Sequence, residues 1–230
     1  MVCAAKGYKI KLVSATAFSK EKLDHMRAYG AELTLVPYDG RGITKQLFFD
    51  MIEAARKITA QPNTFWTNQL ENPDMAAGYA PIADEVWQQT NGSLDAFVQM
   101  VGTSHSLLGV AKRLKHYDSK ITVAAAEPAE SPVLSGGKPG AHGIEGVGIG
   151  YIPPRWQATL VDRIIPVSTK DASAMARRLA REEGLFAGTS SGANVCAAIA
   201  LGKELGPQAR VITLMIDSGL KYLSTDLYAH

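Results

Sequence analysis

The chain has 230 residues, with 24 basic and 22 acidic side chains, a formal net charge of +2 and 46% apolar residues. This is the composition of an ordinary soluble globular protein, and the small net charge argues against binding to nucleic acid or to a membrane surface. The two cysteines lie far apart and the five histidines lack H-x-x-x-H spacing, so neither a disulfide framework nor a zinc-protease type of metal site is expected.

The sequence shows no export or membrane-spanning signal. The amino terminus lacks an apolar core of signal-peptide length. The longest uncharged run, residues 184–202, is rich in glycine and hydroxyl side chains and is therefore too polar to span a membrane. A reducing, cytoplasmic location is expected, in line with the scarce cysteines.

Hydrophobic patterning predicts strands and helices in alternation. In chain order, the expected elements are a strand at 8–14, a helix capped by Ser19 and ending at Gly30, a strand at 32–37, a helix capped by Thr44 and running to about Ala60, a short strand at 64–67, a helix at 76–90, an apolar strand at 94–101, a helix to about His116, strands at 121–126 and 161–167, a helix with its apolar stripe at 172–180, a helix at 192–205 and a strand at 211–216. Such alternation predicts an α/β fold with parallel strands and helices on both faces of the sheet.

A polar segment at residues 68–74 marks a predicted boundary between two lobes. Residues 1–73 are expected to form a smaller amino-terminal lobe, and residues 74–230 a larger one. Residues 2–6 look like the last turn of a helix that is capped by Gly7. Because a lone helical turn is not stable, the sequence predicts that the chain begins inside a fold and that the smaller lobe is incomplete.

Ligands of parallel sheets bind where strands end and helices begin. Gly102 to Ser106 follows the most apolar strand, and its backbone amides at the start of a helix are suited to a phosphate group. The hydroxyls of Thr103, Ser104 and Ser106 add donors, and His105 adds a charge. The spacing leaves open a plain strand-to-helix turn in which a serine is the helix cap.

Two further loops have the same character. Residues 187–192 lie before a helix with glycines that permit close approach of a ligand, although a cap by Ser190 or Ser191 is the alternative. Asp217, Ser218 and Gly219 follow the last strand, where an ordinary turn is the alternative.

Two other motifs are interpreted as structural. The glycines of residues 143–150 lack G-x-G-x-x-G spacing and run into Pro153 and Pro154 rather than a helix, so a shaped loop is expected and not a dinucleotide site. Lys170 follows Ser168 in a pattern that is compatible with a Schiff-base lysine. The acid at Asp171 instead favours a capping box at the start of a helix.

Several motifs together resemble the cysteine synthase family of fold-type II pyridoxal-phosphate enzymes, within the tryptophan synthase beta-like superfamily. The similarity covers nearly the whole chain and rests on Asn68-Gln69-Leu70-Glu71-Asn72-Pro73, on residues 127–138, on residues 180–185 with 188–192, and on Asp217-Ser218-Gly219 with residues 222–225. The resemblance implies a two-lobe, parallel-sheet, three-layer α/β/α fold. It also implies the cofactor pyridoxal 5'-phosphate, a small-molecule amino-acid substrate and a homodimer in the full-length form. The implied reaction is elimination from an activated serine, followed by attack of sulfide or another nucleophile to form cysteine or a related amino acid.

The resemblance also assigns roles to residues. Gly102 to Ser106 corresponds to the loop that cradles the cofactor phosphate, and Ser218 to the serine that hydrogen-bonds the pyridine nitrogen. A neutral hydroxyl partner leaves that nitrogen largely unprotonated, which suits β-elimination and replacement. Gly188 matches the backbone position near the reacting carbon, and Gln69 matches the glutamine that helps to bind the amino-acid carboxylate.

Two departures from the family pattern stand out. The phosphate loop of the family is usually G-T-G-G-T, so Ser104 and His105 replace glycines, and a positive φ at either position would cost strain. The Schiff-base lysine and the Ser/Thr-Gly-Asn substrate loop of the family have no counterpart in this chain, which leaves it with no assigned catalytic residue. The chain as written is therefore expected to be inactive. A non-catalytic binding lobe or pseudoenzyme is one alternative, and an amino-acid dehydratase or another β-replacement synthase is a second.

Overall fold

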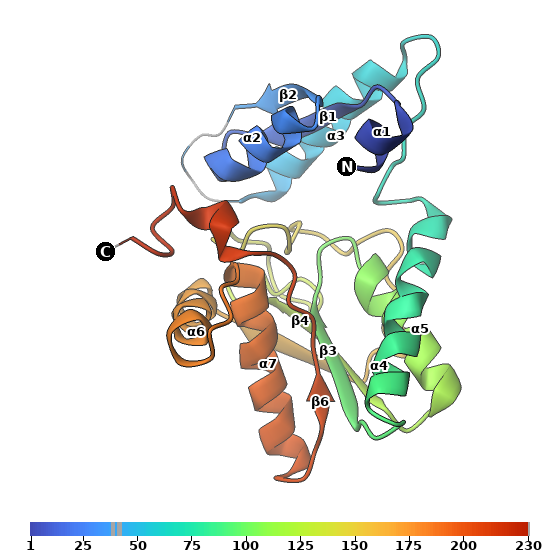
Figure 1. Cartoon of the computed structure of the whole chain (residues 1–230), viewed down its shortest axis with the longest axis vertical. Helices are drawn as coiled ribbons and strands as arrows, with labels where there is room; N and C mark the ends of the chain where they lie inside the picture. The colour runs from blue at the N-terminus through green and yellow to red at the C-terminus, as the bar shows by residue number, and fades with distance from the viewer. Residues whose placement is uncertain (38–39, 41–42, 230) are drawn as a thin grey trace.

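The computed structural model describes residues 1–37, 40 and 43–229, and all of its described strands are parallel. Strands β1 (Lys11–Ala15) and β2 (Glu32–Val36) form a small sheet. A larger sheet has the order β5-β4-β3-β6, formed by β3 (Ala96–Met100), β4 (Thr122–Pro128), β5 (Arg163–Val167) and β6 (Val211–Ile212). Figure 1 shows the small sheet above one end of the larger one.

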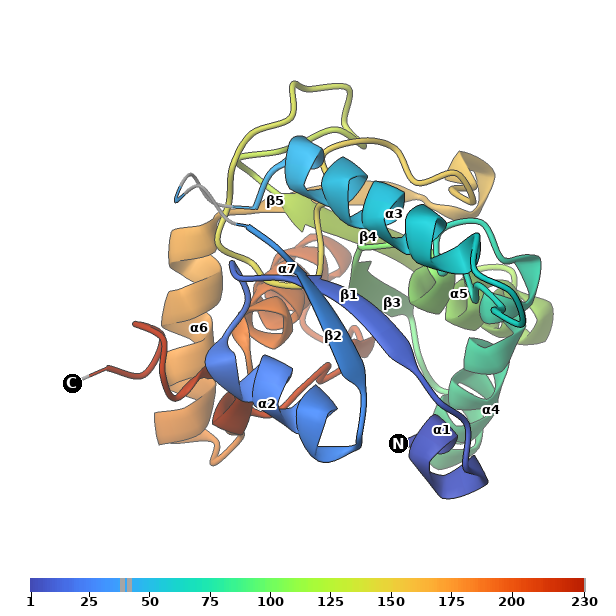
Figure 2. The ribbon, with the colours of Figure 1, turned by 90° about the horizontal axis from the view of Figure 1, so that it is seen from above.

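Seven helices are described: α1 (Val2–Lys6), α2 (Lys20–Ala28), α3 (Lys45–Thr59), α4 (Ala80–Gln89), α5 (His105–Tyr117), α6 (Thr169–Glu182) and α7 (Thr189–Leu205). The described residues also form four short 3₁₀ turns: η1 (Pro73–Met75), η2 (Ala77–Tyr79), η3 (Ala158–Leu160) and η4 (Gly219–Tyr222). Helices α4 and α5 cover one face of the larger sheet, and α6 and α7 cover the other (Figure 1). Figure 2 shows β1 and β2 lying over the larger sheet, with α2 and α3 on either side of them.

The core follows from the alternation of side chains along β3, in which every residue is buried. Val98 packs against α7, where it joins a cluster with Leu201. The preceding residue, Phe97, points to the opposite face of the sheet and packs with Leu107 and Leu114 of α5. A strand that is apolar on both faces is typical of a parallel sheet covered by two helical layers. The predicted α/β/α arrangement is therefore confirmed.

Three predicted elements differ from the structure. Residues 64–67 form no strand, because this extended segment makes no ladder with any described strand; Phe65 is 84% exposed. The last strand is limited to β6, because beyond it Ile216 donates its amide to Ser191 Oγ at 2.9 Å instead of to a strand. The helix expected at 76–90 begins as 3₁₀ turns and becomes α4 only at Ala80.

Helix caps were predicted with mixed success. Thr44 Oγ1 accepts the amide of Leu47, and Ser168 Oγ accepts the amide of Asp171, so both caps are confirmed. Ser19 precedes α2 as predicted, but its hydroxyl makes no cap bond and has no partner in the described part of the chain. Helix α7 begins at Thr189, three positions before the predicted start, and Gly188 is its cap residue in place of Ser190 or Ser191.

The short helix α1 has the form that the sequence predicts. It spans Val2–Lys6, and Gly7 ends it in the left-handed region at φ 73°. The division of the chain at residue 73 stays a prediction. The small sheet precedes this position and the larger sheet follows it.

Candidate functional site

The loop after β3 leads directly into α5. Gly102 lies so close to the backbone of Gly146 that a Cβ atom would stand 2.7 Å from the carbonyl oxygen of Gly146, so only glycine fits there. Ser104 adopts φ 72° and ψ −13°, the left-handed region that a residue with a side chain rarely occupies. The sequence predicts strain at Ser104 or His105 if either residue adopts a positive φ. Ser104 does so, and His105 does not.

The start of α5 presents donors that the described residues leave unsatisfied. Helical hydrogen bonding begins with the bond from Leu108 N to Ser104 O at 2.9 Å, so the amides of His105, Ser106 and Leu107 precede it. The hydroxyl of Ser104 is buried and has no hydrogen-bond partner among the described residues. Amides at a helix start and a free buried hydroxyl together form a site that favours an anion.

His105 lies at the start of α5 with only 2% of its surface exposed. Its Nε2 atom is 2.8 Å from the carbonyl oxygen of Gln69. Burial lowers the pKa of His105 below its ordinary value, the bond to Gln69 opposes this shift, and the charge of Arg155 adds to it. The structure thus brings together two residues that the sequence placed in separate motifs. It also favours a neutral imidazole at His105, where the sequence led us to expect a charge.

The other two candidate loops lie side by side. Ala187 and Ser218 form an antiparallel bridge. A Cβ atom on Gly188 would stand 2.3 Å from Asp217 Oδ1 and from the ring of Tyr222, which fixes glycine at the start of α7. Ser218 Oγ accepts the amide of Leu220 at 3.2 Å, and its own proton stays available for donation.

The glycine-rich segment 143–150 connects these two groups of loops. On one side Gly148 N donates to Val101 O at 2.9 Å, next to the loop after β3. On the other side Glu145 N donates to Thr189 Oγ1 at 3.3 Å, in the first turn of α7. His142 fixes the path between them, because its Nε2 contacts Gly148 O at 2.8 Å. The segment has a defined shape and forms a shared wall between the two groups.

A cluster that the sequence analysis missed joins the small sheet's α2 to these loops. The ammonium group of Lys22 lies 2.7 Å from Glu145 Oε2, 2.8 Å from the Tyr222 hydroxyl and 3.6 Å from Asp217 Oδ2. Tyr222 donates to Asp217 Oδ2 at 2.9 Å, and burial together with the negative charges of Asp217 and Glu145 raises its pKa far above the ordinary value. Lys22 and Tyr222 are 200 positions apart, and no sequence motif connects them.

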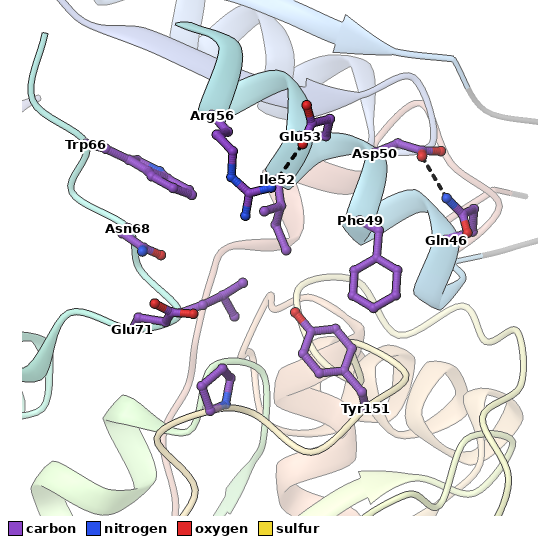
Figure 3. A pocket seen from close by; sticks show the side chains of 12 residues that line it. Gln46, Phe49, Asp50, Ile52, Glu53, Arg56, Trp66, Asn68, Glu71 and Tyr151 are labelled. Carbon is purple, nitrogen blue, oxygen red and sulfur yellow. Dashed lines mark hydrogen bonds and ion pairs between the residues drawn. The ribbon is translucent and has the colours of Figure 1, made fainter. Parts of the chain in front are cut away.

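A separate open cleft of about 560 Å³ lies between α3 and the segments 66–71 and 151–154. Figure 3 shows Phe49 of α3 next to Tyr151 in its lining, and their ring centroids are 5.3 Å apart. Of the predicted site residues that the structure describes, none lines this cleft, although Asn68 and Leu70 on either side of Gln69 do. The cleft is therefore a neighbour of the candidate site and not its centre.

The remaining sequence motifs have structural roles. Lys170 is exposed in the first turn of α6, after the confirmed cap at Ser168.

Across residues 1–37, 40 and 43–229, no three His, Cys, Asp or Glu side chains are grouped as metal ligands would be. None of the helices in the described part of the chain is long and apolar enough to cross a membrane.

Comparisons with known proteins agree on one family. A family model described as "Pyridoxal-phosphate dependent enzyme" matches residues 1–217. The chain is 41% identical over 230 residues to a cysteine synthase of Staphylococcus aureus (strain N315), which covers 99% of this chain and 72% of that protein. A cysteine synthase structure from Entamoeba histolytica superposes with a TM-score of 0.87 at 38% identity, covering 98% of this chain and 66% of that one.

A second solved structure extends the comparison. An O-acetylserine dependent cystathionine beta-synthase from Helicobacter pylori superposes with a TM-score of 0.89 at 33% identity, covering 99% of this chain and 73% of that one. The chain therefore spans between 66% and 73% of the length of these relatives.

Proposed function

The chain belongs to the pyridoxal-phosphate dependent enzyme family, and from this premise we propose that it is the cofactor-binding part of a cysteine synthase-like enzyme. The substrate class is an activated serine. The reaction class is β-elimination followed by addition of sulfide or another nucleophile. The observation that carries the proposal is the start of α5, where the amides and the buried hydroxyl of Ser104 offer donors that the described residues leave unused. Segment 143–150 links this anion site to the loops that hold Gly188 and Ser218.

The residues present fit pyridoxal 5'-phosphate. The amides of residues 105–107 and the hydroxyl of Ser104 would hold its phosphate, because both supply donors that the described residues leave unused. Ser218 would stand at the pyridine nitrogen, since its hydroxyl accepts from Leu220 and keeps a proton to donate. When bound, the cofactor supplies an electron sink for bond cleavage at the amino acid.

Other residues of the chain would bind and orient the cofactor and the substrate. Gly188 keeps side-chain atoms away from the position next to Asp217 and Tyr222, and so leaves room for a close ligand. Gln69 has an exposed side chain in a turn that His105 ties to the start of α5, and we assign it to the substrate carboxylate. Segment 143–150 is hydrogen-bonded to both groups of loops and so holds them in a fixed arrangement.

We further propose that residues 1–230 by themselves bind the cofactor without completing the reaction. Lys22 is the lysine whose ammonium group approaches Asp217 beside Ser218, and Glu145 and Tyr222 already engage it. Lys170 is exposed at the start of α6. A lysine that serves as a covalent nucleophile must be free of such partners and reach the cofactor, and neither of these two meets the requirement.

The test is cofactor binding by the purified chain. Calorimetric titration with pyridoxal 5'-phosphate is compared with pyridoxal, which lacks the phosphate. The proposal expects binding that is at least tenfold tighter for the phosphorylated form and weaker in Ser218→Ala. The control Ser119→Ala changes an exposed turn serine and should bind normally. Equal affinity for the two forms, or no binding of either, would refute the cofactor assignment.

The lysine proposal has its own readout. Borohydride treatment of the complex, followed by intact-mass and peptide analysis, detects any aldimine with a lysine. We expect no adduct that is specific to one lysine. A stoichiometric adduct at Lys22 or Lys170 would show that the chain supplies its own Schiff-base lysine, and would overturn the proposal of inactivity.

A further inference from the structure

His105 contributes a side chain where the resemblance leads one to expect a glycine, and the structure shows what that side chain does. Its Nε2 lies 2.8 Å from Gln69 O, across 36 positions of sequence. A carbonyl oxygen only accepts, so Nε2 carries the proton and the imidazole is the donor. The histidine end of the bond is buried, because His105 is 2% exposed, whereas Gln69 lies at the surface.

The imidazole and the anion-binding amides point in different directions. His105 and Gly109 are one helical turn apart and therefore share a face of α5. That face packs on the segment after Gln69, because a Cβ atom on Gly109 would stand 2.1 Å from Ala76 O. The unsatisfied amides instead point along the helix axis at its start. The His105 side chain thus serves the 69–79 segment and leaves the phosphate position to the backbone.

Gln69 lies in a turn that is closed by local hydrogen bonds, one of them from Asn72 Nδ2 to Thr67 O at 3.2 Å. The amides of Glu71 and Asn72 both donate to Asn68 O, at 3.1 and 3.0 Å. Asn68 itself adopts a positive φ of 40°, and the Gln69 side chain is exposed. The bond from His105 joins this turn to the buried start of α5.

We propose that His105 is a positioning residue, which couples the placement of Gln69 to the phosphate loop through the bond from Nε2 to the Gln69 carbonyl. This inference rests on the proposed function, because it assigns Gln69 to the substrate. Phosphate binding orders the start of α5, and His105 carries that order to the turn that holds Gln69. Loss of one such bond corresponds to about a fivefold change in the opening equilibrium of the turn, by the usual net value for a hydrogen bond.

The experiment measures amide hydrogen exchange at Glu71 and Asn72, with and without pyridoxal 5'-phosphate. His105→Phe keeps the ring and removes the donor, and His105→Gln restores a donor on a flexible side chain. His116→Gln is the matched control, since His116 is exposed in the last turn of the same helix. Exchange in α7 reports whether each variant is folded.

The proposal expects exchange at Glu71 and Asn72 to be about fivefold faster in His105→Phe, and close to wild type in His105→Gln and His116→Gln. It also expects added cofactor to slow this exchange in the wild type and to have little effect on it in His105→Phe. Unchanged exchange in His105→Phe would overturn the proposal. So would a loss of cofactor affinity in His105→Phe with the turn intact, because His105 would then act on the phosphate. If neither the wild type nor any variant binds the cofactor, but exchange at Glu71 and Asn72 is still faster in His105→Phe, then the bond from His105 does hold the turn. In that case the proposed function is refuted separately.

Discussion

Replacing Lys22 with methionine tests whether the buried cluster holds the small sheet's α2 to the candidate site. The substitution keeps a long apolar side chain and removes the charge. It leaves the carboxylates of Glu145 and Asp217 without the cation that both of them approach. The cluster is well enclosed, since the side chains of Lys22, Glu145 and Asp217 are 18%, 13% and 9% exposed.

The expected cost follows from this burial. Removing one partner of a fully buried ion pair destabilises a protein by about 3–5 kcal/mol, because the remaining charge has lost its compensation. Lys22 keeps some contact with water, so part of that penalty is screened. We therefore expect Lys22→Met to lower the free energy of unfolding by about 2–3 kcal/mol, somewhat less than for a fully buried pair.

Urea denaturation of a double-mutant cycle provides the measurement. The cycle combines Lys22→Met with Glu145→Gln, and residues in direct contact should show a non-additive cost. Lys20→Met is the matched control, because Lys20 lies on the same helix with a 78% exposed side chain, and exposed pairs contribute little to stability. The reasoning is refuted if Lys22→Met costs no more than Lys20→Met, or if the two single changes in the cycle simply add.

Three further predictions use other contacts. Gly192→Ala should destabilise by about 2–4 kcal/mol in thermal or urea unfolding, because its Cβ would stand 2.1 Å from the backbone of Ala172 and force α6 and α7 apart; an unchanged midpoint would contradict this. Ser104→Gly should stabilise by about 0.5–1 kcal/mol by relieving the positive φ, so a lower stability would argue against strain there. Burial lowers the pKa of His142 in the folded chain below the ordinary value of 6.5, so the unfolded chain binds the proton at a higher pH than the folded chain does. The contribution of the neutral His142 to stability is therefore complete above about pH 6.5, and it is lost as the pH falls from there through the lower pKa of the folded chain. Urea unfolding from pH 7.5 to 5 should show this decline, and His142→Gln should flatten it.

The larger sheet could be predicted well from the sequence, because the hydrophobic pattern of a strand such as β3 is visible without its neighbours. β3 is apolar on both faces, and the helices around it have clear stripes and caps such as Ser168. Residues 64–67 show the limit of that signal. Their composition favours a strand, but a strand forms only against a neighbouring ladder, and composition says nothing about a neighbour.

The candidate site was predictable in its loops and not in its connections. Gly188 and Ser218 were singled out from separate motifs, and the structure joins their loops through the bridge between Ala187 and Ser218. Lys22 carried no motif, because its partners Glu145 and Tyr222 lie 123 and 200 positions away. Contacts over such separations arise from the topology of the chain, which brings α2 onto η4.

Ser104 and His105 are best understood as one feature of the loop. The left-handed turn at Ser104 costs roughly 1–2 kcal/mol for a residue with a side chain. The helix then begins at the next residue, so that His105 is buried and reaches Gln69. The bond gained offsets about 1 kcal/mol of that cost. Replacing Ser104 by glycine should therefore stabilise the chain while leaving the turn at Gln69 as protected as before, whereas replacing His105 should free the turn without relieving the strain. If Ser104→Gly also accelerates exchange at Asn72, the left-handed turn depends on the serine, and the two residues act as a single unit.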